Sequence, residues 1–207
     1  MEKEPNYLED ISQIRNIMEK SSKFLSLSGL SGILIGIYAL IGSYIAYRMF
    51  YFSEKIVYHD IVNVNLSPNV VNVLILGFSV LVLAVSTSFI LAVRKAKKNG
   101  YKIWDHTAKR LAVNLLIPLV TGGILVIILF IKGYIGFLAP FTLIFYGLAL
   151  VNGSKYTYDE YRYLGICEIV LGLISSYIDG YGIIFWAIGF GVFHIIYGTV
   201  MYFKYER

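Results

Sequence analysis

Long apolar runs alternate with short polar segments along most of the 207-residue chain. A helix needs about 20 residues to cross the hydrocarbon core of a bilayer, and the runs are near or above that length. They lack the period-two alternation of barrel strands and are too long for such strands. The pattern therefore predicts an all-α fold, a polytopic bundle of six transmembrane helices at residues 27–47, 70–93, 111–131, 135–151, 163–178 and 183–201.

The polar segments divide the chain into three parts. Residues 1–26 are predicted to form a cytoplasmic amphipathic segment, because Leu8, Ile11 and Ile14 recur at helical spacing. A partly ordered lead into the first span is the alternative. Residues 27–203 form one membrane domain, and 204–207 a short cytoplasmic tail. No cleaved signal peptide is expected, since the charged start lacks an apolar core that ends in small residues.

Lysine and arginine residues fall mostly on one side of the predicted spans. Of the 18, only Arg48, Lys55 and Lys132 lie in the loops of the other side, which leaves 15 with the two ends of the chain. Basic residues concentrate on the cytoplasmic side of membrane proteins. Both termini are therefore predicted to be cytoplasmic, in agreement with an even number of spans.

The composition supports a membrane location. Hydrophobic residues make up 57% of the chain and charged residues 15%, and the mean hydropathy is +0.69. A soluble domain of this length could not enclose so much apolar surface. The net charge of +5 is explained by orientation in the bilayer, so the lipid bilayer is the expected partner and nucleic acid is not. The single cysteine, Cys167, excludes an intramolecular disulfide.

Small residues line one face of the first predicted span. Because helices in lipid associate through close backbone contact, this face is expected to pack on protein. Gly32 and Gly36 also form a GxxxG pair, whose partner helix lies either in the same chain or in a second copy. A homo-oligomer or another membrane-protein partner thus stays open. The residues of the stripe are Gly29, Gly32, Gly36, Ala39, Ser43 and Ala46.

The last two spans each carry one ionisable residue on a small-residue face. Glu168 shares its face with Gly165, Gly172 and Ser175, and His194 shares its face with Ala187, Gly191 and Gly198. In an antiparallel hairpin centred near residue 181, Glu168 and His194 lie at equal depth, about 20 Å along each helix from the turn. The two are predicted to meet within the membrane as a hydrogen-bonded or charged pair.

Two roles stay open for this pair. In the structural interpretation, each side chain satisfies the other, or bonds Ser175 or a backbone carbonyl. In the functional interpretation, the pair handles a proton or contacts a ligand. A lone charge deep in a bilayer costs about 3 kcal/mol on insertion scales, which explains why the two groups should pair but does not separate the two roles.

The chain holds no sequence motif of a known catalytic centre. It has no Walker loop, no GxSxG and no HExxH. His59, His106 and His194 are predicted outside, inside and within the membrane, so they cannot converge on one metal. No metal site, no cofactor and no enzymatic activity is therefore expected.

Two segments, SSKFLSLSGLSG before the first span and FHIIYGTVMYFKYER at the end, resemble uncharacterised small multi-pass proteins of bacterial inner membranes. The resemblance implies an inner-membrane location and carries no activity. Three classes of function follow. The first is a structural, regulatory or partner-binding membrane protein, which sparse interior polarity favours. The second is a small permease or exporter component that uses Glu168 and His194, and the residual third is a membrane-embedded enzyme.

Overall fold

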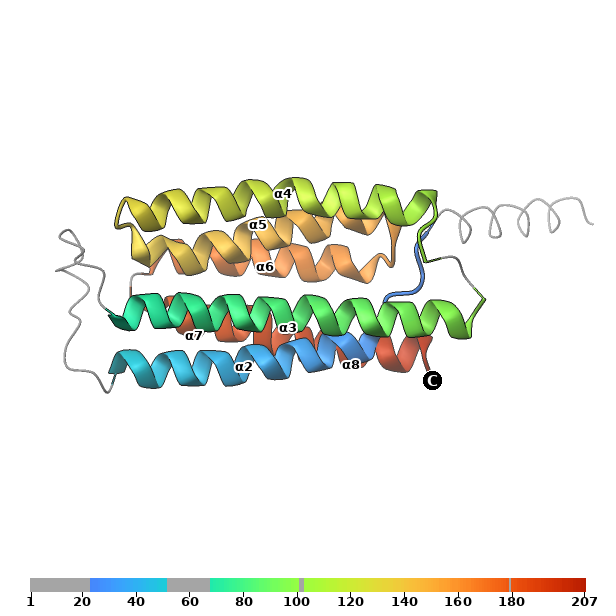
Figure 1. Cartoon of the computed structure of the whole chain (residues 1–207), viewed down its shortest axis with the longest axis horizontal. Coiled ribbons are helices and arrows are strands. Elements are labelled where there is room, and N and C mark those ends of the chain that lie inside the picture. The colour runs from blue at the N-terminus through green and yellow to red at the C-terminus, as the bar shows by residue number, and fades with distance from the viewer. Residues whose placement is uncertain (1–22, 52–67, 101–102, 179) are drawn as a thin grey trace, which may run out of the picture.

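The structure is a computed structural model that describes residues 23–51, 68–100, 103–178 and 180–207. Over these ranges it is a bundle of long helices without a strand (Figure 1). The amphipathic segment predicted within residues 1–26 falls almost wholly outside the described residues. The helices are α2 (Gly29–Tyr51), α3 (Pro68–Lys98), α4 (His106–Ile131), α5 (Leu138–Gly153), α6 (Glu160–Tyr177) and the continuous run α7 (Gly182–Trp186), η4 (Ala187–Phe193) and α8 (His194–Tyr205).

The helices follow the apolar runs of the sequence. Five segments are long and apolar enough to cross a membrane: Gly29–Met49, Val71–Lys98, His106–Ile131, Ile135–Tyr156 and Gly182–Tyr205. The remaining helix, α6, is more polar because its 18 residues include Glu160, Arg162 and Glu168. The predicted all-helical class is thus confirmed for the described residues, with five segments apolar enough to span.

Charged side chains and glycines explain where several helices begin and end. Asp105 caps α4, and its carboxylate accepts a 2.6 Å hydrogen bond from the amide of Ala108. α3 continues past the predicted end of its apolar run to Lys98, since lysines in a last turn interact favourably with the helix dipole. After α4, Gly133 adopts a φ of +82°, which lets the chain reverse within the predicted turn before α5.

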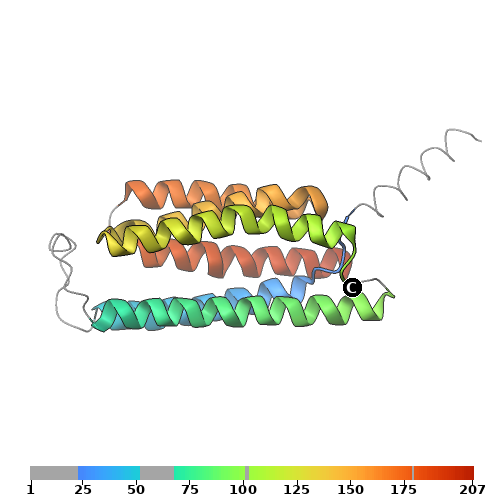
Figure 2. The ribbon, with the colours of Figure 1, turned by 45° about the horizontal axis from the view of Figure 1, so that its top comes forward.

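The bundle has two groups of helices with the last helix between them (Figures 1 and 2). In one group, α5 packs between α4 and α6; in the other, α2 packs against α3 and against the run formed by η4 and α8. The main neighbour of α3 is α2, and that of α4 is α5. α3 and α4 therefore lie at the edges of their groups.

The small-residue face of α2 packs directly on the backbone of the last helix. A Cβ added at Gly198 would lie 2.5 Å from the amide nitrogen of Ile33 and 2.6 Å from the carbonyl oxygen of Gly29. One added at Gly36 would lie 2.6 Å from the carbonyl oxygen of Gly191. The GxxxG face thus meets a helix of the same chain, so self-association would require another surface. Ala39, Ser43 and Ala46 on this stripe are buried as well.

A network of polar contacts ties three helix ends together beside the C-terminus. The carboxylate of Glu206 accepts hydrogen bonds from the Gly29 amide at 2.6 Å and the Ser28 hydroxyl at 3.1 Å. Lys95, in the last turn of α3, donates to Glu206 at 3.0 Å and to the carbonyl of Leu27 at 2.7 Å. These bonds satisfy groups at the start of α2 and hold the end of α3 against it.

Candidate functional site

Glu168 lies in the middle of α6 with its side chain fully enclosed. Its helix sits close to α5 because glycines lie at the contact. A Cβ added at Gly165 would lie 2.7 Å from the carbonyl oxygen of Gly147, and one at Gly172 would lie 2.9 Å from that of Pro140. The predicted stripe of α6, which includes buried Ser175, therefore faces protein. Glu168 points from it toward the last helix.

His194 begins α8 and lies beside this carboxyl group. The distance from His194 Nδ1 to Glu168 Oε1 is 3.5 Å, and both side chains are buried. Nδ1 also lies 3.1 Å from the carbonyl oxygen of Gly189. Because a carbonyl oxygen only accepts hydrogen bonds, Nδ1 carries a proton in this arrangement. The two residues predicted to pair at equal depth are thus brought together by the structure.

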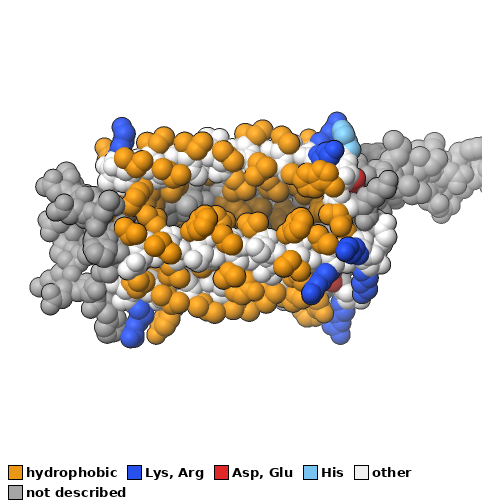
Figure 3. All heavy atoms as spheres, viewed as in Figure 1, with side chains coloured by type: hydrophobic (Ala, Val, Ile, Leu, Met, Phe, Trp, Pro, Cys, Tyr) orange, Lys and Arg blue, Asp and Glu red, His pale blue; other side chains and the backbone are white. Residues whose placement is uncertain are grey.

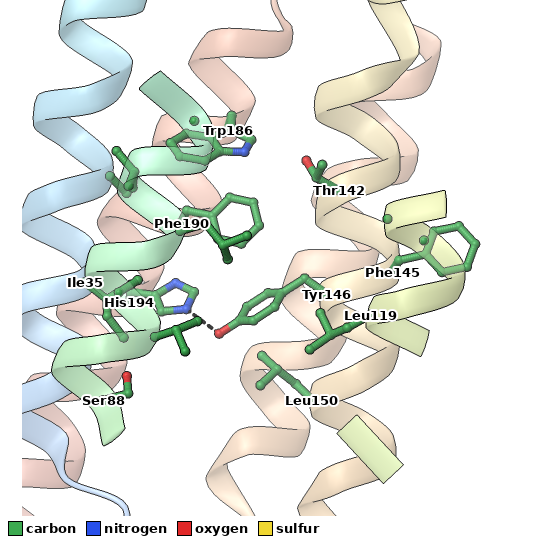
Figure 4. Close-up of a pocket in the computed structure, with 18 of the residues that line it drawn as sticks. Ile35, Ser88, Leu119, Thr142, Phe145, Tyr146, Leu150, Trp186, Phe190 and His194 are labelled. Carbon is green, nitrogen blue, oxygen red and sulfur yellow. Dashed lines mark hydrogen bonds between the residues drawn. The ribbon is translucent and has the colours of Figure 1, made fainter. Parts of the chain in front are cut away.

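Tyr146 of α5 completes a row of three polar side chains. Its hydroxyl lies 2.7 Å from His194 Nε2, the ring nitrogen opposite the one near Glu168 (Figure 4). The ring centroids of Tyr146 and Phe190 are 5.0 Å apart, and those of Phe190 and Trp186 are 4.8 Å apart. These aromatic contacts hold the phenol and the imidazole in place. The row runs from a carboxyl through an imidazole to a phenol.

Sequence reasoning missed Tyr146, although a signal existed. A tyrosine within an apolar run contributes to helix hydrophobicity and does not stand out as Glu168 does. The equal-depth argument, applied to the loop between α5 and α6, would have found it. Tyr146 and Glu168 are equally far in sequence from position 157, which lies in that loop.

The small-residue face predicted for the last helix is divided between two neighbours. Gly191 and Gly198 contact α2, whereas the imidazole of His194 reaches α5 and α6. Ala187 is only half-buried and borders a shallow pocket against α2. Gly189, which the prediction omitted, lies against the Glu168 carboxyl group. The segment Ala187–Phe193 is a π-helix, whose wider turn breaks the 3.6-residue spacing on which the prediction relied.

Burial restricts the charge that the row can carry. Among the residues that the structure describes, neither carboxyl oxygen of Glu168 has a hydrogen-bond partner, and an isolated buried carboxylate is costly. Glu168 and His194 together are neutral in two forms, as an acid beside an imidazole or as a carboxylate beside an imidazolium. Both forms contain the same number of protons. The hydroxyl of Tyr146 fits either form because it can donate to Nε2 or accept from it.

Tyr146 and His194 also line a large cavity inside the bundle. Its volume is about 1600 Å³, above the roughly 300–1000 Å³ of ordinary small-molecule sites. The walls include residues of α3 between Val73 and Val93 and residues of α4 between Leu111 and Ile127, and the space between the two helices is hollow on the molecular surface (Figure 3). No Lys, Arg, Asp or Glu is among the described residues that line it. Glu168 lies behind this wall.

Further hydroxyl groups lie on the same side of the cavity as Tyr146. Tyr161 of α6 and Tyr197 of α8 line it, with ring centroids 4.9 Å apart. Most of the opposite wall, on α3 and α4, is aliphatic, and Ser88 is its one hydroxyl side chain among the described lining residues. The cavity is therefore apolar over most of its surface, with few hydrogen-bonding side chains on α3 and α4 and most of them on α2, α5, α6 and α8.

The described residues hold no group of three or more His, Cys, Asp and Glu side chains placed to bind a metal ion. His106 begins α4, whereas His194 begins α8, and His59 falls outside the described ranges. No family model matches the chain, and neither a curated protein nor a solved structure matches it. The resemblance of the two short segments stays a prediction, and a function must be argued from the site.

Proposed function

We propose that this protein crosses a cell membrane six times and binds a membrane-soluble, mostly apolar molecule in the cavity between α3 and α4. It would act as a small permease or exporter component. The observation that carries the proposal is the cavity itself, which has an uncharged lining and places Tyr146 and His194 at its wall. A structural or partner-binding protein, which the sparse interior polarity of the sequence favours, does not require such a space.

The charge distribution supports a threading with both termini in the cytoplasm. The C-terminus, the start of α2, the end of α3 and the start of α4 lie at the same end of the bundle (Figure 1). Lys95, Lys97 and Lys98 end α3 there, and basic side chains gather at this end (Figure 3). A reporter enzyme that works only in the cytoplasm should be active when it is fused after Arg207. Activity of a reporter that works only in the periplasm, fused at the same position, would contradict the threading.

The edge positions of α3 and α4 provide a route for the ligand. Both helices expose apolar outer faces, with side chains such as Leu83 and Ile117, which do not line the cavity, more than half exposed. An apolar molecule dissolved in the bilayer would reach the cavity between these helices without passing a charged side chain. Once inside, it would bury its apolar surface at no cost in desolvated charge.

Cavity-filling substitution tests the binding directly. Gly123 of α4 lines the cavity, and a Cβ added there meets no atom within 4 Å, so Gly123→Phe would occupy the cavity without straining the fold. Its neighbour Ile124 is exposed and does not line the cavity, which makes Ile124→Phe the matched control. Binding is read from energy transfer between Trp186 on the cavity wall and a neutral pyrene probe.

The wild type and Ile124→Phe should bind the probe alike, and Gly123→Phe should bind it at least about tenfold more weakly. Gly77→Phe repeats the test from α3, because Gly77 also lines the cavity and has no atom within 4 Å of an added Cβ. Equal probe binding by all four proteins would contradict the proposal.

A further inference from the structure

We infer that Tyr146, His194 and Glu168 form a proton-exchange site for a lipophilic weak base, such as a tertiary amine, held in the cavity. The inference rests on the proposed function and names the class of its ligand. Of these three residues, Tyr146 and His194 line the cavity and Glu168 does not. Glu168 lies behind them, with both carboxyl oxygens unpartnered among the described residues.

The distances define the direction in which a proton can travel. The Tyr146 hydroxyl is 2.7 Å from His194 Nε2, and His194 Nδ1 is 3.5 Å from Glu168 Oε1. Nδ1 also contacts the carbonyl oxygen of Gly189, which fixes the ring and keeps a proton on this nitrogen. Nε2 is thus the nitrogen that exchanges its proton. Glu168 stabilises the imidazolium, as an acid behind a catalytic histidine does.

The transfer can be written with every proton placed. Before transfer, Glu168 is a carboxylate, His194 is an imidazolium, and its Nε2–H donates to the Tyr146 oxygen. The Tyr146 O–H bond breaks as its proton bonds to the amine nitrogen, and the Nε2–H bond breaks as its proton passes to the Tyr146 oxygen. After transfer, the ligand is an ammonium ion, the imidazole is neutral, and Tyr146 donates to Nε2. The Glu168 carboxylate then balances the ligand charge.

The lining of the cavity favours a basic ligand over an acidic one. An acidic ligand that lost its proton would leave an anion in a cavity whose described lining has no Lys or Arg. An ammonium ion instead gains the Glu168 carboxylate as its counter-charge. It also gains the faces of Trp186, Phe190 and Tyr146, because cations bind the faces of aromatic rings.

Few other titratable groups face the row. From α6, Tyr161 joins Glu168, and from α8, Tyr197 joins His194; both tyrosines line the cavity. From α2, Tyr47 lines the cavity, and the described lining residues of α3 and α4 include no titratable side chain. Glu168 and His194 are therefore the groups that can exchange a proton with the ligand near neutral pH, where tyrosine stays protonated.

The protonation state of the bound ligand tests the inference. The probes are a tertiary amine joined to pyrene by a single methylene and its carbon isostere, in which CH replaces the nitrogen. The free-base amine quenches the pyrene by electron transfer, whereas the ammonium ion does not. At a mildly alkaline pH above the pKa of the amine, the probe is a quenched free base in water, and the amine bound to the wild type should take a proton from the row and fluoresce as the ammonium ion. The isostere, which cannot take up a proton, sets the unquenched brightness. The amine should also bind about tenfold more tightly than the isostere.

Glu168→Gln and Tyr146→Phe keep the size of the side chain and should leave the bound amine as the quenched free base, without a preference for the amine over the isostere. Ser88→Ala removes a hydroxyl of α3 that lines the cavity outside the row, and should preserve both the ammonium fluorescence and the preference (Figure 4). Isostere binding should be equal in all four proteins, which shows that the variants fold. Amine bound to the wild type as the quenched free base, or ammonium fluorescence that persists in Glu168→Gln, would overturn the inference alone. If neither probe binds the wild type, the proposed function fails as well.

Discussion

Gly189 lies directly against the carboxyl group of Glu168, so that a Cβ on Gly189 would overlap Oε2 of Glu168 and lie 2.6 Å from Cδ2 of Leu143. Both neighbours are enclosed, and neither can move aside freely. Gly189→Ala should therefore destabilise the protein by about 1–3 kcal/mol, the usual cost of overpacking a core. Thermal unfolding in detergent measures the loss. Gly123→Ala, which meets no atom within 4 Å, should unfold as the wild type does, and equal unfolding of all three proteins would contradict the packing.

The contact between α2 and α8 gives a second prediction. Because Gly198 touches the backbone of α2, Gly198→Leu should force the two helices apart and lower the unfolding temperature. Ile196 is more than half exposed on the same helix, so Ile196→Leu should leave the unfolding temperature unchanged. A matching decrease in both variants would show that the substituted surface, and not the close backbone contact, causes the effect.

Two of the ion pairs between side chains should contribute differently to stability because they differ in burial. Lys95 and Glu206 are about 15% and 14% exposed, whereas Lys23 and Asp159 are 31% and 75% exposed. Glu206→Gln leaves Lys95 poorly solvated and without its counter-charge, and should cost about 1–3 kcal/mol. Asp159→Asn should cost no more than about 1 kcal/mol, since exposed pairs contribute little. Chemical unfolding measures the free energy of unfolding lost in each variant. A larger loss in Asp159→Asn than in Glu206→Gln would contradict this prediction.

Glu160 at the start of α6 makes the stability of the protein depend on pH. Burial alone would raise the pKa of its carboxyl group, but hydrogen bonds from Lys204 and Tyr205 outweigh burial and lower the pKa below its ordinary value. A lowered pKa in the folded state adds stability that is present above the ordinary pKa and is lost as the pH falls through the lower folded value. Glu160→Gln should remove this acid-sensitive part of stability. Unfolding curves from neutral to acidic pH measure it, and an unchanged pH profile would contradict the assignment.

Much of the fold could be predicted because lipid imposes strict rules on sequence. Apolar runs of spanning length located the helices, and small residues at steps of three and four located the face of α2 that meets Gly198. Equal distance from a turn placed Glu168 opposite His194, and the structure has their side chains 3.5 Å apart. These inferences use one helix or one hairpin at a time.

The parts that sequence reasoning missed depend on more than one hairpin or on irregular geometry. Tyr146 is level with Glu168 across the hairpin of α5 and α6, but its contact with His194 depends on packing between α5 and α8, which are not consecutive in sequence. Gly189 reaches Glu168 through a π-helix that ordinary helical spacing does not anticipate. The cavity arises because α3 and α4 belong to different groups of helices, an arrangement that no residue pattern within either helix specifies.

An experimental structure determined in a lipid bilayer disc, with the pyrene-labelled amine present, most directly tests whether the space between α3 and α4 is a binding site. Density for one ligand should lie among the cavity-lining residues, with its nitrogen within hydrogen-bond distance of the Tyr146 hydroxyl. If α3 and α4 instead pack directly against each other, with no cavity and no ligand between them, the binding site and the function proposed from it are contradicted.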